Sequence, residues 1–471
     1  MREITVAEPR VPGLWASLRE AVVGTSQDFT EGSIGRAIVL LAVPMVLEMC
    51  MESLFGIVDV FWVAHLGADA ISTVGLTETC MTVLYCIALG LGMGATALVA
   101  RRTGEKDEEA AGVVAVQAIF IGLVIAGVSA TLGYIFAPSL LRLMGGSDDV
   151  VRIGSGYTRM MFAGSASIFL LFLINAVLRG AGDAATAMRV LWIANIVNIG
   201  LNPCLIFGVG PFPRLGVTGS ALGTTIGRGV GVLVQLWVLG SSRSRLVVGA
   251  RQIRLDLAVM LRLIRLSISA VFQYLVQMAS WIGLVRIMAS FGSAAVAANT
   301  LAIRVIIFAL LPSWGMSNAA ATLVGQNLGA GKPKRAEQSV WRTGLYNMVF
   351  LGAVGLIFII FADPIIALFT NDPAVAPLAA SGLRIFSYGY ISYSWGMVVT
   401  ASFNGAGDTF TPTMLNLLCF WLCQIPVAWT LAFHTSLGPR GVFTAAVIGD
   451  TLLAVTSILL FRRGKWKRTV V

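Results

Sequence analysis

The chain has 471 residues, of which 57% are apolar and only 12% are charged. Soluble globular proteins carry about 25% charged residues, so this composition excludes an ordinary soluble enzyme or binding domain. The formal net charge of +10 would suit a nucleic-acid partner only if its distribution along the chain were ignored.

Long apolar runs recur along the chain, and many reach the ~20 residues that cross a bilayer as a helix. We therefore predict an all-α integral membrane protein with twelve transmembrane helices, six in each half. The predicted spans lie near 37–66, 70–100, 110–137, 150–178, 186–209 and 217–240, then near 262–290, 294–325, 338–370, 376–402, 411–434 and 441–461.

The two halves repeat each other at a fixed step of 225 residues. Gly67 and Gly292, Gly90 and Gly315, and Gly104 and Gly329 are among the matched pairs. Each copy holds an even number of spans, so both copies enter the membrane from the same side. This parallel repeat predicts two six-helix lobes related by an axis along the membrane normal, with a substrate site near the midplane between them.

The basic residues indicate the topology. With the N-terminus taken as cytoplasmic, 24 Lys and Arg residues fall on the cytoplasmic side and 4 on the other, as the positive-inside rule requires. We therefore expect a multi-pass protein of the plasma (inner) membrane with both termini cytoplasmic, anionic lipid as a contact and no nucleic-acid partner. The predicted parts are a cytoplasmic tail at 1–33, an N-lobe at 34–240, a cytoplasmic linker at 241–258, a C-lobe at 259–463 and a basic tail at 464–471.

Acidic residues inside the predicted spans need a reason, because a charge in the bilayer core costs at least about 2.5–3.5 kcal/mol. The first span carries Glu48, Glu52 and Asp59 on one face, since these positions fall within about 40° of one another on a helix. The matched residues of the second half are Gln273, Gln277 and Leu284, so the acids belong to one lobe. Either glutamate could line a substrate path or neutralise Arg228 in the sixth span.

Several oxygen-bearing side chains fall at similar depths in the first half. At about 1.5 Å per residue, Asp59, Glu78, Asn202 and Thr224 lie roughly 10–12 Å from the outer ends of their spans, and Asn198 lies somewhat deeper. Such a set suits a proton or a small hard cation. We expect these five residues to couple ion movement, with a possible Na⁺ site at Asp59, Asn198 and Asn202; a plain hydrogen-bond network between helices is the alternative.

The second half carries amides and aromatic side chains instead. Aromatic faces and amides suit flat organic cations. The predicted substrate contacts are Glu48, Glu52, Gln273, Gln277, Trp314, Tyr388, Tyr393 and Trp395. Arg304 and Asp450 lie at similar depth and are predicted to form a structural ion pair. In the first span, Pro44 removes one helical hydrogen bond and is a predicted hinge.

Several motifs together resemble the multidrug and toxic compound extrusion (MATE) family of secondary antiporters. They are Pro44 with Glu52 to Asp59, the run Arg179-Gly-Ala-Gly-Asp183, the run Asn198-Ile-Gly-Leu-Asn202-Pro203, and residues 298–304 and 324–331. The resemblance covers about residues 33–463. It implies export of amphipathic, often cationic compounds driven by inward H⁺ or Na⁺, with the coupling aspartate of the family falling on Asp59 and no other cofactor.

Two departures from the family pattern stand out. Asn202 occupies a position where many relatives carry a second acid, and the C-lobe lacks the acids that one branch uses in spans seven and ten. The DinF-like branch is therefore the closer comparison. We expect a monomer that handles small organic substrates.

Two other functions fit parts of this sequence. A flippase for lipid-linked oligosaccharides would suit a more cationic cleft than the acidic first lobe offers. An intramembrane protease is suggested by Gly-Ala-Gly-Asp, which ends at Asp183 and again at Asp408, but a turn between spans explains this motif better.

Overall fold

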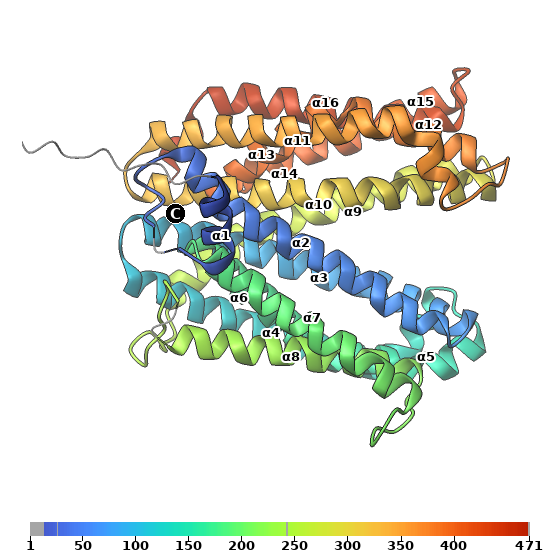
Figure 1. Ribbon diagram of the computed structural model, residues 1–471, viewed down its shortest axis with the longest axis horizontal. Coiled ribbons are helices and arrows are strands. Elements are labelled where there is room, and N and C mark those ends of the chain that lie inside the picture. The colour runs from blue at the N-terminus through green and yellow to red at the C-terminus, as the bar shows by residue number, and fades with distance from the viewer. Residues whose placement is uncertain (1–13, 26, 242–243, 470–471) are drawn as a thin grey trace, which may run out of the picture.

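The computed structural model describes residues 14–25, 27–241 and 244–469. Within these ranges every regular element is a helix, and the helices form two bundles that lie side by side (Figure 1). The fold class predicted from the sequence is confirmed.

The first bundle, the N-lobe, begins with the short helix α1 (Leu14–Val23), which precedes the apolar helices. Its other helices are α2 (Ile34–Ala64), α3 (Ala68–Gly104), α4 (Glu108–Leu143), α5 (Asp148–Ala163), α6 (Ser165–Gly180), α7 (Ala184–Phe207) and α8 (Val217–Gly240).

The second bundle, the C-lobe, repeats this order. Its helices are α9 (Leu257–Ala289), α10 (Ser293–Gly329), α11 (Pro333–Ala367), α12 (Ala376–Tyr388), α13 (Tyr390–Gly405), α14 (Phe410–Asn416), the π-helix η1 (Leu417–Gln424), α15 (Ile425–Phe433), α16 (Pro439–Arg462) and the short 3₁₀ helix η2 (Lys465–Arg468). Helices α14, η1 and α15 form one continuous span.

Ten helices in the described ranges, counting α14 to α15 as one, are long and apolar enough to cross a membrane. The pair α5 and α6 forms an eleventh, bent by 41° at Gly164. Helices α12 and α13 break at Gly389, 225 residues after Gly164. The repeat therefore extends to the position of a helix break.

Matched glycines let the two lobes touch around the repeat axis. A Cβ atom on Gly104 would lie 2.0 Å from the Gln326 carbonyl oxygen, and one on Gly329 would lie 2.1 Å from the Arg101 carbonyl oxygen. Gly104 and Gly329 are repeat mates, as are Arg101 and Gln326, so the two contacts are symmetry equivalents. Any side chain at either glycine would force the lobes apart.

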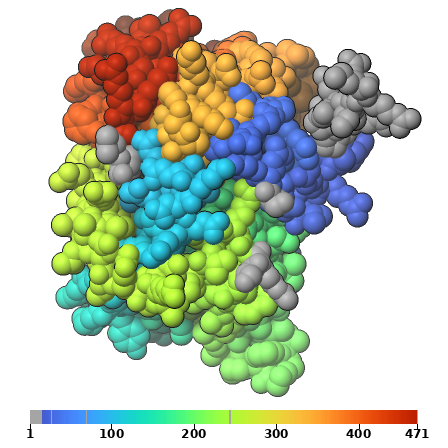
Figure 2. Space-filling model, turned by 90° about the vertical axis from the view of Figure 1, so that its left-hand side faces the viewer, coloured from blue at the N-terminus to red at the C-terminus, as the bar shows by residue number. Residues whose placement is uncertain are grey.

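The lobes meet tightly at one end of the molecule and diverge towards the other. Helices α2 and α3 slope away from α9 and α10 from left to right in Figure 1, while α1 and the C-terminal end lie together on the left. We call this left-hand end the closed end. Seen from it, the light-blue atoms after α3 lie directly against the light-orange atoms around the α10–α11 turn (Figure 2).

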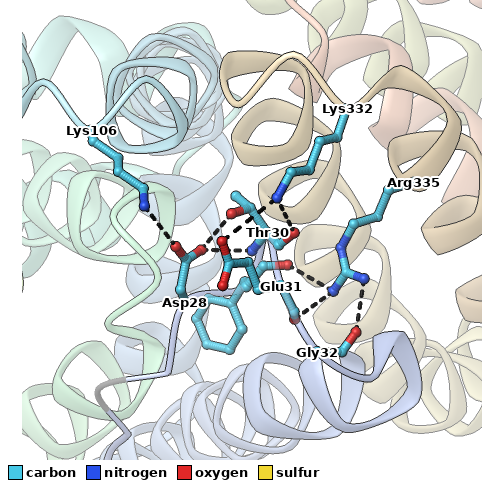
Figure 3. A network of polar contacts seen from close by, with 8 residues as sticks. Asp28, Thr30, Glu31, Gly32, Lys106, Lys332 and Arg335 are labelled. Carbon is cyan, nitrogen blue, oxygen red and sulfur yellow. Dashed lines mark hydrogen bonds and ion pairs between the residues drawn. The ribbon is translucent and has the colours of Figure 1, made fainter.

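A short strap, residues 27–33, joins the lobes across the closed end (Figure 3). Arg335 of the C-lobe donates hydrogen bonds to the carbonyl oxygens of Gly32 at 2.8 Å, Glu31 at 2.7 Å and Phe29 at 3.2 Å. Lys332 donates to the Thr30 carbonyl at 3.0 Å. On the N-lobe side, Lys106 lies 3.6 Å from the Asp28 carboxylate. The N-terminal segment is thus a cross-link between lobes, and more than the simple tail expected from its polarity.

The basic linker is also docked at this end. Arg245 donates to the carbonyl oxygens of Thr25 and Gln27, the latter at 2.6 Å, and its guanidinium lies 4.6 Å from the centre of the Phe29 ring. The linker therefore supports the strap from the N-lobe side.

Candidate functional site

Asp59 is buried where three N-lobe helices meet. Its Oδ1 atom accepts hydrogen bonds from Asn202 Nδ2 of α7 at 2.8 Å and from Ser220 Oγ of α8 at 2.6 Å. The carboxylate of α2 thus holds α7 and α8 together through one oxygen atom. Ser220 is absent from the set predicted from sequence, although it lies one helical turn before Thr224 on the same face of α8.

Asn198 and Thr224 extend this network away from Asp59. Asn198 Nδ2 donates to Thr224 Oγ1 at 3.1 Å and also lies 3.5 Å from Asn202 Oδ1. Both amides are almost completely buried. The structure therefore joins four of the five predicted ion-coupling residues into one chain of hydrogen bonds.

Glycines in α8 make this close packing possible. A Cβ atom on Gly223 would lie 2.3 Å from Asn202 Oδ1, and one on Gly227 would lie 2.7 Å from the Ala194 carbonyl oxygen. Small residues at helix contacts allow polar side chains to reach across between membrane helices. The sequence of α8 thus brings its hydroxyls within reach of α7.

The fifth predicted residue, Glu78, stands apart from the network. Its side chain is exposed and forms no hydrogen bond or ion pair with any residue that the structure describes. Similar depth in two spans did not translate into contact, because depth does not fix the rotation of α3 about its axis.

Glu48 has a different partner from the one suggested by the sequence. Its Oε1 atom accepts hydrogen bonds from Arg179 Nη1 of α6 at 2.6 Å and from Asn175 Nδ2 at 3.0 Å. Its side chain is only 2% exposed. Glu48 therefore neutralises Arg179, a residue that the topology count places on the cytoplasmic side, and not Arg228.

Arg228 is instead paired with Glu52. The two side chains approach to 3.8 Å, and Arg228 also donates to the Tyr85 hydroxyl at 3.3 Å. The guanidinium lies 5.2 Å from the centre of the Phe55 ring, a distance typical of cation–π contacts. The interpretation that one glutamate neutralises Arg228 thus holds for Glu52 alone.

A cavity of about 300 Å³ lies between the lobes. Helices α2, α3 and α6 of the N-lobe and α9, α10, α13 and α16 of the C-lobe contribute to its wall. Of the predicted substrate contacts, five line it: Glu52, Gln273, Gln277, Trp314 and Tyr393. The cavity between the lobes thus has the acidic and the aromatic sides predicted from the sequence.

Three predicted substrate contacts lie elsewhere. Glu48 is behind Arg179, and Tyr388 is 66% exposed next to the break between α12 and α13. Trp395 packs against Trp341 and donates its indole N–H to the Met348 sulfur at 3.2 Å. None of these three predicted substrate contacts is in the cavity wall, because residue type alone does not show which face of a helix is turned inwards.

The predicted ion pair between Arg304 and Asp450 is also wrong. No salt bridge joins them within the described ranges. Arg304 is exposed on α10, whereas Asp450 of α16 lines the cavity. Matching depth again failed to predict contact.

The two Gly-Ala-Gly-Asp motifs form helix starts and not a catalytic pair. Asp183 accepts from the backbone N–H of Thr186 at 3.3 Å, and Asp408 accepts from that of Thr411 at 3.1 Å. The preceding Gly182 and Gly407 have φ of 84° and 88°, which glycine adopts without strain. Asp183 is the N-cap of α7, and Asp408 accepts a backbone N–H at the start of α14, so each aspartate has a structural role within its own lobe.

Comparisons with known proteins agree with this architecture. The MatE family profile matches residues 44–204 and 267–430, one block in each lobe. The probable multidrug resistance protein YoeA of Bacillus subtilis is 27% identical over 450 residues, 94% of this chain and 96% of the relative. The probable multidrug resistance protein NorM of Thermotoga maritima is 25% identical over 93% of this chain and 94% of its own length.

A solved structure is similar over the same extent. It is titled as the outward-facing conformation of a multidrug resistance MATE family transporter of the MOP superfamily. It has a TM-score of 0.87 and 26% identity, and the match covers 94% of this chain and 98% of that one.

Proposed function

Because the chain belongs to the MatE family of membrane transporters, we propose that it is a multidrug efflux antiporter driven by ion entry through the Asp59 network. Its substrates are amphipathic, often cationic organic compounds, and its coupling ion is H⁺ or Na⁺. The observation that carries the proposal is one buried carboxylate, held by α7 and α8, on the same helix that lines the central cavity.

The arrangement around Asp59 favours a proton over Na⁺. The amide nitrogen of Asn202, and not its oxygen, faces the carboxylate, whereas a sodium ion needs a shell of oxygen ligands. A Na⁺ site at Asp59, Asn198 and Asn202 would require the amide of Asn202 to turn around. A proton needs only the carboxylate.

Helix α2 is the element that links the two sites. Asp59 does not line the cavity, but Glu52 does, about 10 Å away along the same helix at 1.5 Å per residue. Protonation of Asp59 weakens its hydrogen bonds to α7 and α8, since charged acceptors form the stronger bonds. The released helix then shifts at Glu52, and Pro44 between the cavity and the closed end is the proposed hinge.

The closed end is proposed to face the cytoplasm of a plasma (inner) membrane. The linker, the start of α11 and the turns after α3 and α10 carry basic residues there, among them Arg245, Lys106 and Lys332, as the positive-inside rule requires. The cavity would then be reached from the outer side, in agreement with the outward-facing relative. Anionic lipid headgroups are the expected neighbours of these basic residues, and we expect the protein to act as a monomer.

Transport in proteoliposomes tests the function. Purified protein is reconstituted, a proton or a sodium gradient is imposed alone, and movement of a cationic dye is followed. Dye should move against its gradient with the proton gradient and stop when the gradient is collapsed. Dye movement that ignores both gradients would refute antiport, and movement with sodium alone would refute the proton.

A further inference from the structure

We propose that Asp450 is the residue that recognises the positive charge of substrates in the central cavity. The inference rests on the proposed function and adds to it a specific anchor in the C-lobe. It departs from the role that depth in the membrane suggests for Asp450, which is pairing with Arg304.

The charges around the cavity single out Asp450. Three charged residues line the wall: Arg179, Glu52 and Asp450. Arg179 is neutralised by buried Glu48 at 2.6 Å, and Glu52 is paired with buried Arg228 at 3.8 Å. Asp450 has no hydrogen bond or ion pair with any described residue. Asp450 is therefore the one carboxylate in the described cavity wall that no group of the protein neutralises.

An unpaired carboxylate in a membrane helix is costly unless it meets a cation or water. The other two charged residues of the cavity wall, Arg179 and Glu52, have ion-pair partners within the protein. Asp450 is half-buried and faces a space large enough for part of a drug-sized molecule, which suits a partner that enters and leaves. A mobile organic cation meets that requirement.

An aromatic wall stands beside this carboxylate. Trp314 donates its indole N–H to the Tyr393 hydroxyl at 3.4 Å, which fixes the two rings relative to each other. Tyr393 is within electrostatic range of Asp450, and Phe420 also lines the cavity. Aromatic faces attract cations and cover flat apolar rings. The combination suits a flat, monovalent cation.

The charge is specific to one lobe. The residue 225 positions before Asp450 is Thr225, and a Cβ atom on Gly164 would lie 2.4 Å from its hydroxyl oxygen. Thr225 is thus packed against the break between α5 and α6. Substrate charge and coupling ion are therefore assigned to opposite lobes: the cation to Asp450 and the proton to Asp59. Substrate and proton must therefore compete through a change in conformation, because they do not share one carboxylate.

Binding to purified protein in detergent tests this assignment without any gradient. Ethidium, a flat cation, and Nile red, a flat neutral dye of similar size, are titrated and followed by fluorescence anisotropy. Asp450→Asn should weaken ethidium binding about tenfold, or about 1.4 kcal/mol, and leave Nile red within about twofold. Asp450→Glu should restore ethidium binding. Asp372→Asn removes an exposed acid of the same lobe outside the cavity and should change neither dye.

A second variant keeps the test valid if Asp450→Asn does not fold. Asp450→Thr introduces the residue found at the matched position 225; it removes the same carboxylate with a smaller side chain and should weaken ethidium selectively by a similar factor. Unchanged ethidium binding, or equal loss of both dyes, in the folded variant would overturn the assignment. The proposed function would survive that result if gradient-driven transport by the wild type persists, and it would fall only if the wild type moves no dye under either gradient.

Discussion

Asp59→Asn separates the structural role of Asp59 from its role in coupling. Both hydrogen bonds to Asp59 end on the same atom, Oδ1. An asparagine can keep that oxygen in place and put its amide group where Oδ2 was. The substitution therefore removes the titratable charge, while its side-chain oxygen still accepts the hydrogen bonds from Asn202 and Ser220.

The expected cost in stability is small. Hydrogen bonds to charged acceptors contribute about 1.5–3 kcal/mol and neutral ones about 0.5–1.5 kcal/mol. Two weakened bonds therefore cost about 2–3 kcal/mol, and less once the cost of burying the charge is removed. Asp59→Leu, which introduces the residue found at the matched position 284, is the contrast. It leaves Asn202 Nδ2 and Ser220 Oγ without an acceptor, at about 1–3 kcal/mol each.

The assay compares thermal unfolding with transport for the same preparations. Asp59→Asn should unfold within a few degrees of wild type yet lose proton-driven dye efflux, whereas Asp59→Leu should lose both. Dye exchange without a gradient reports whether Asp59→Asn can still change conformation. Wild-type rates of proton-driven efflux in folded Asp59→Asn would refute the coupling role, and a large loss of stability in Asp59→Asn would refute the hydrogen-bond geometry.

Further predictions concern the hinge, the buried ion pair and the strap. Pro44→Ala restores a backbone N–H in α2 and should slow turnover while leaving the dye dissociation constant unchanged; equal turnover would argue against a hinge. Glu48→Gln should destabilise the protein by about 3 kcal/mol, because it leaves buried Arg179 unpaired, and should weaken cation binding by adding positive charge to the cavity; an unaltered unfolding temperature would contradict this. Arg335→Ala removes three hydrogen bonds to the strap and should increase opening of the closed end. The opening would be measured as a longer distance between spin labels at positions 105 and 334 in a cysteine-free background. Arg335→Lys is the milder control. Burial opposes ionisation of Asp28, but hydrogen bonds from Thr30 and the charge of Lys106 hold the pKa of its carboxyl below the ordinary 3.8. The contact between Asp28 and Lys106 is therefore fully formed above pH 3.8 and is lost as the pH falls through the lowered pKa. The same spin labels should then move apart in acid. Asp28→Asn should abolish this pH dependence.

The amino-acid sequence alone determined the architecture and most members of the hydrogen-bond network around Asp59. A repeat of 225 residues, an even number of spans and the distribution of basic residues are linear properties of the chain, so they need no coordinates. Asp59, Asn198, Asn202 and Thr224 could be grouped because a buried carboxylate in an apolar span needs partners, and few polar residues lay at its depth.

The tertiary structure decided which partners the remaining charges have. Glu48 pairs with Arg179 and Asp450 faces the cavity, although depth in the membrane suggested Arg228 and Arg304. Depth follows from counting residues at a constant rise, but contact also depends on how each helix is rotated and where it sits in its bundle. Those two quantities are set by side-chain packing between segments far apart in sequence, such as the glycines of α8 against α7. For the same reason the strap between the lobes could not be predicted: its main contacts are backbone carbonyl groups, which every residue carries and no sequence pattern marks.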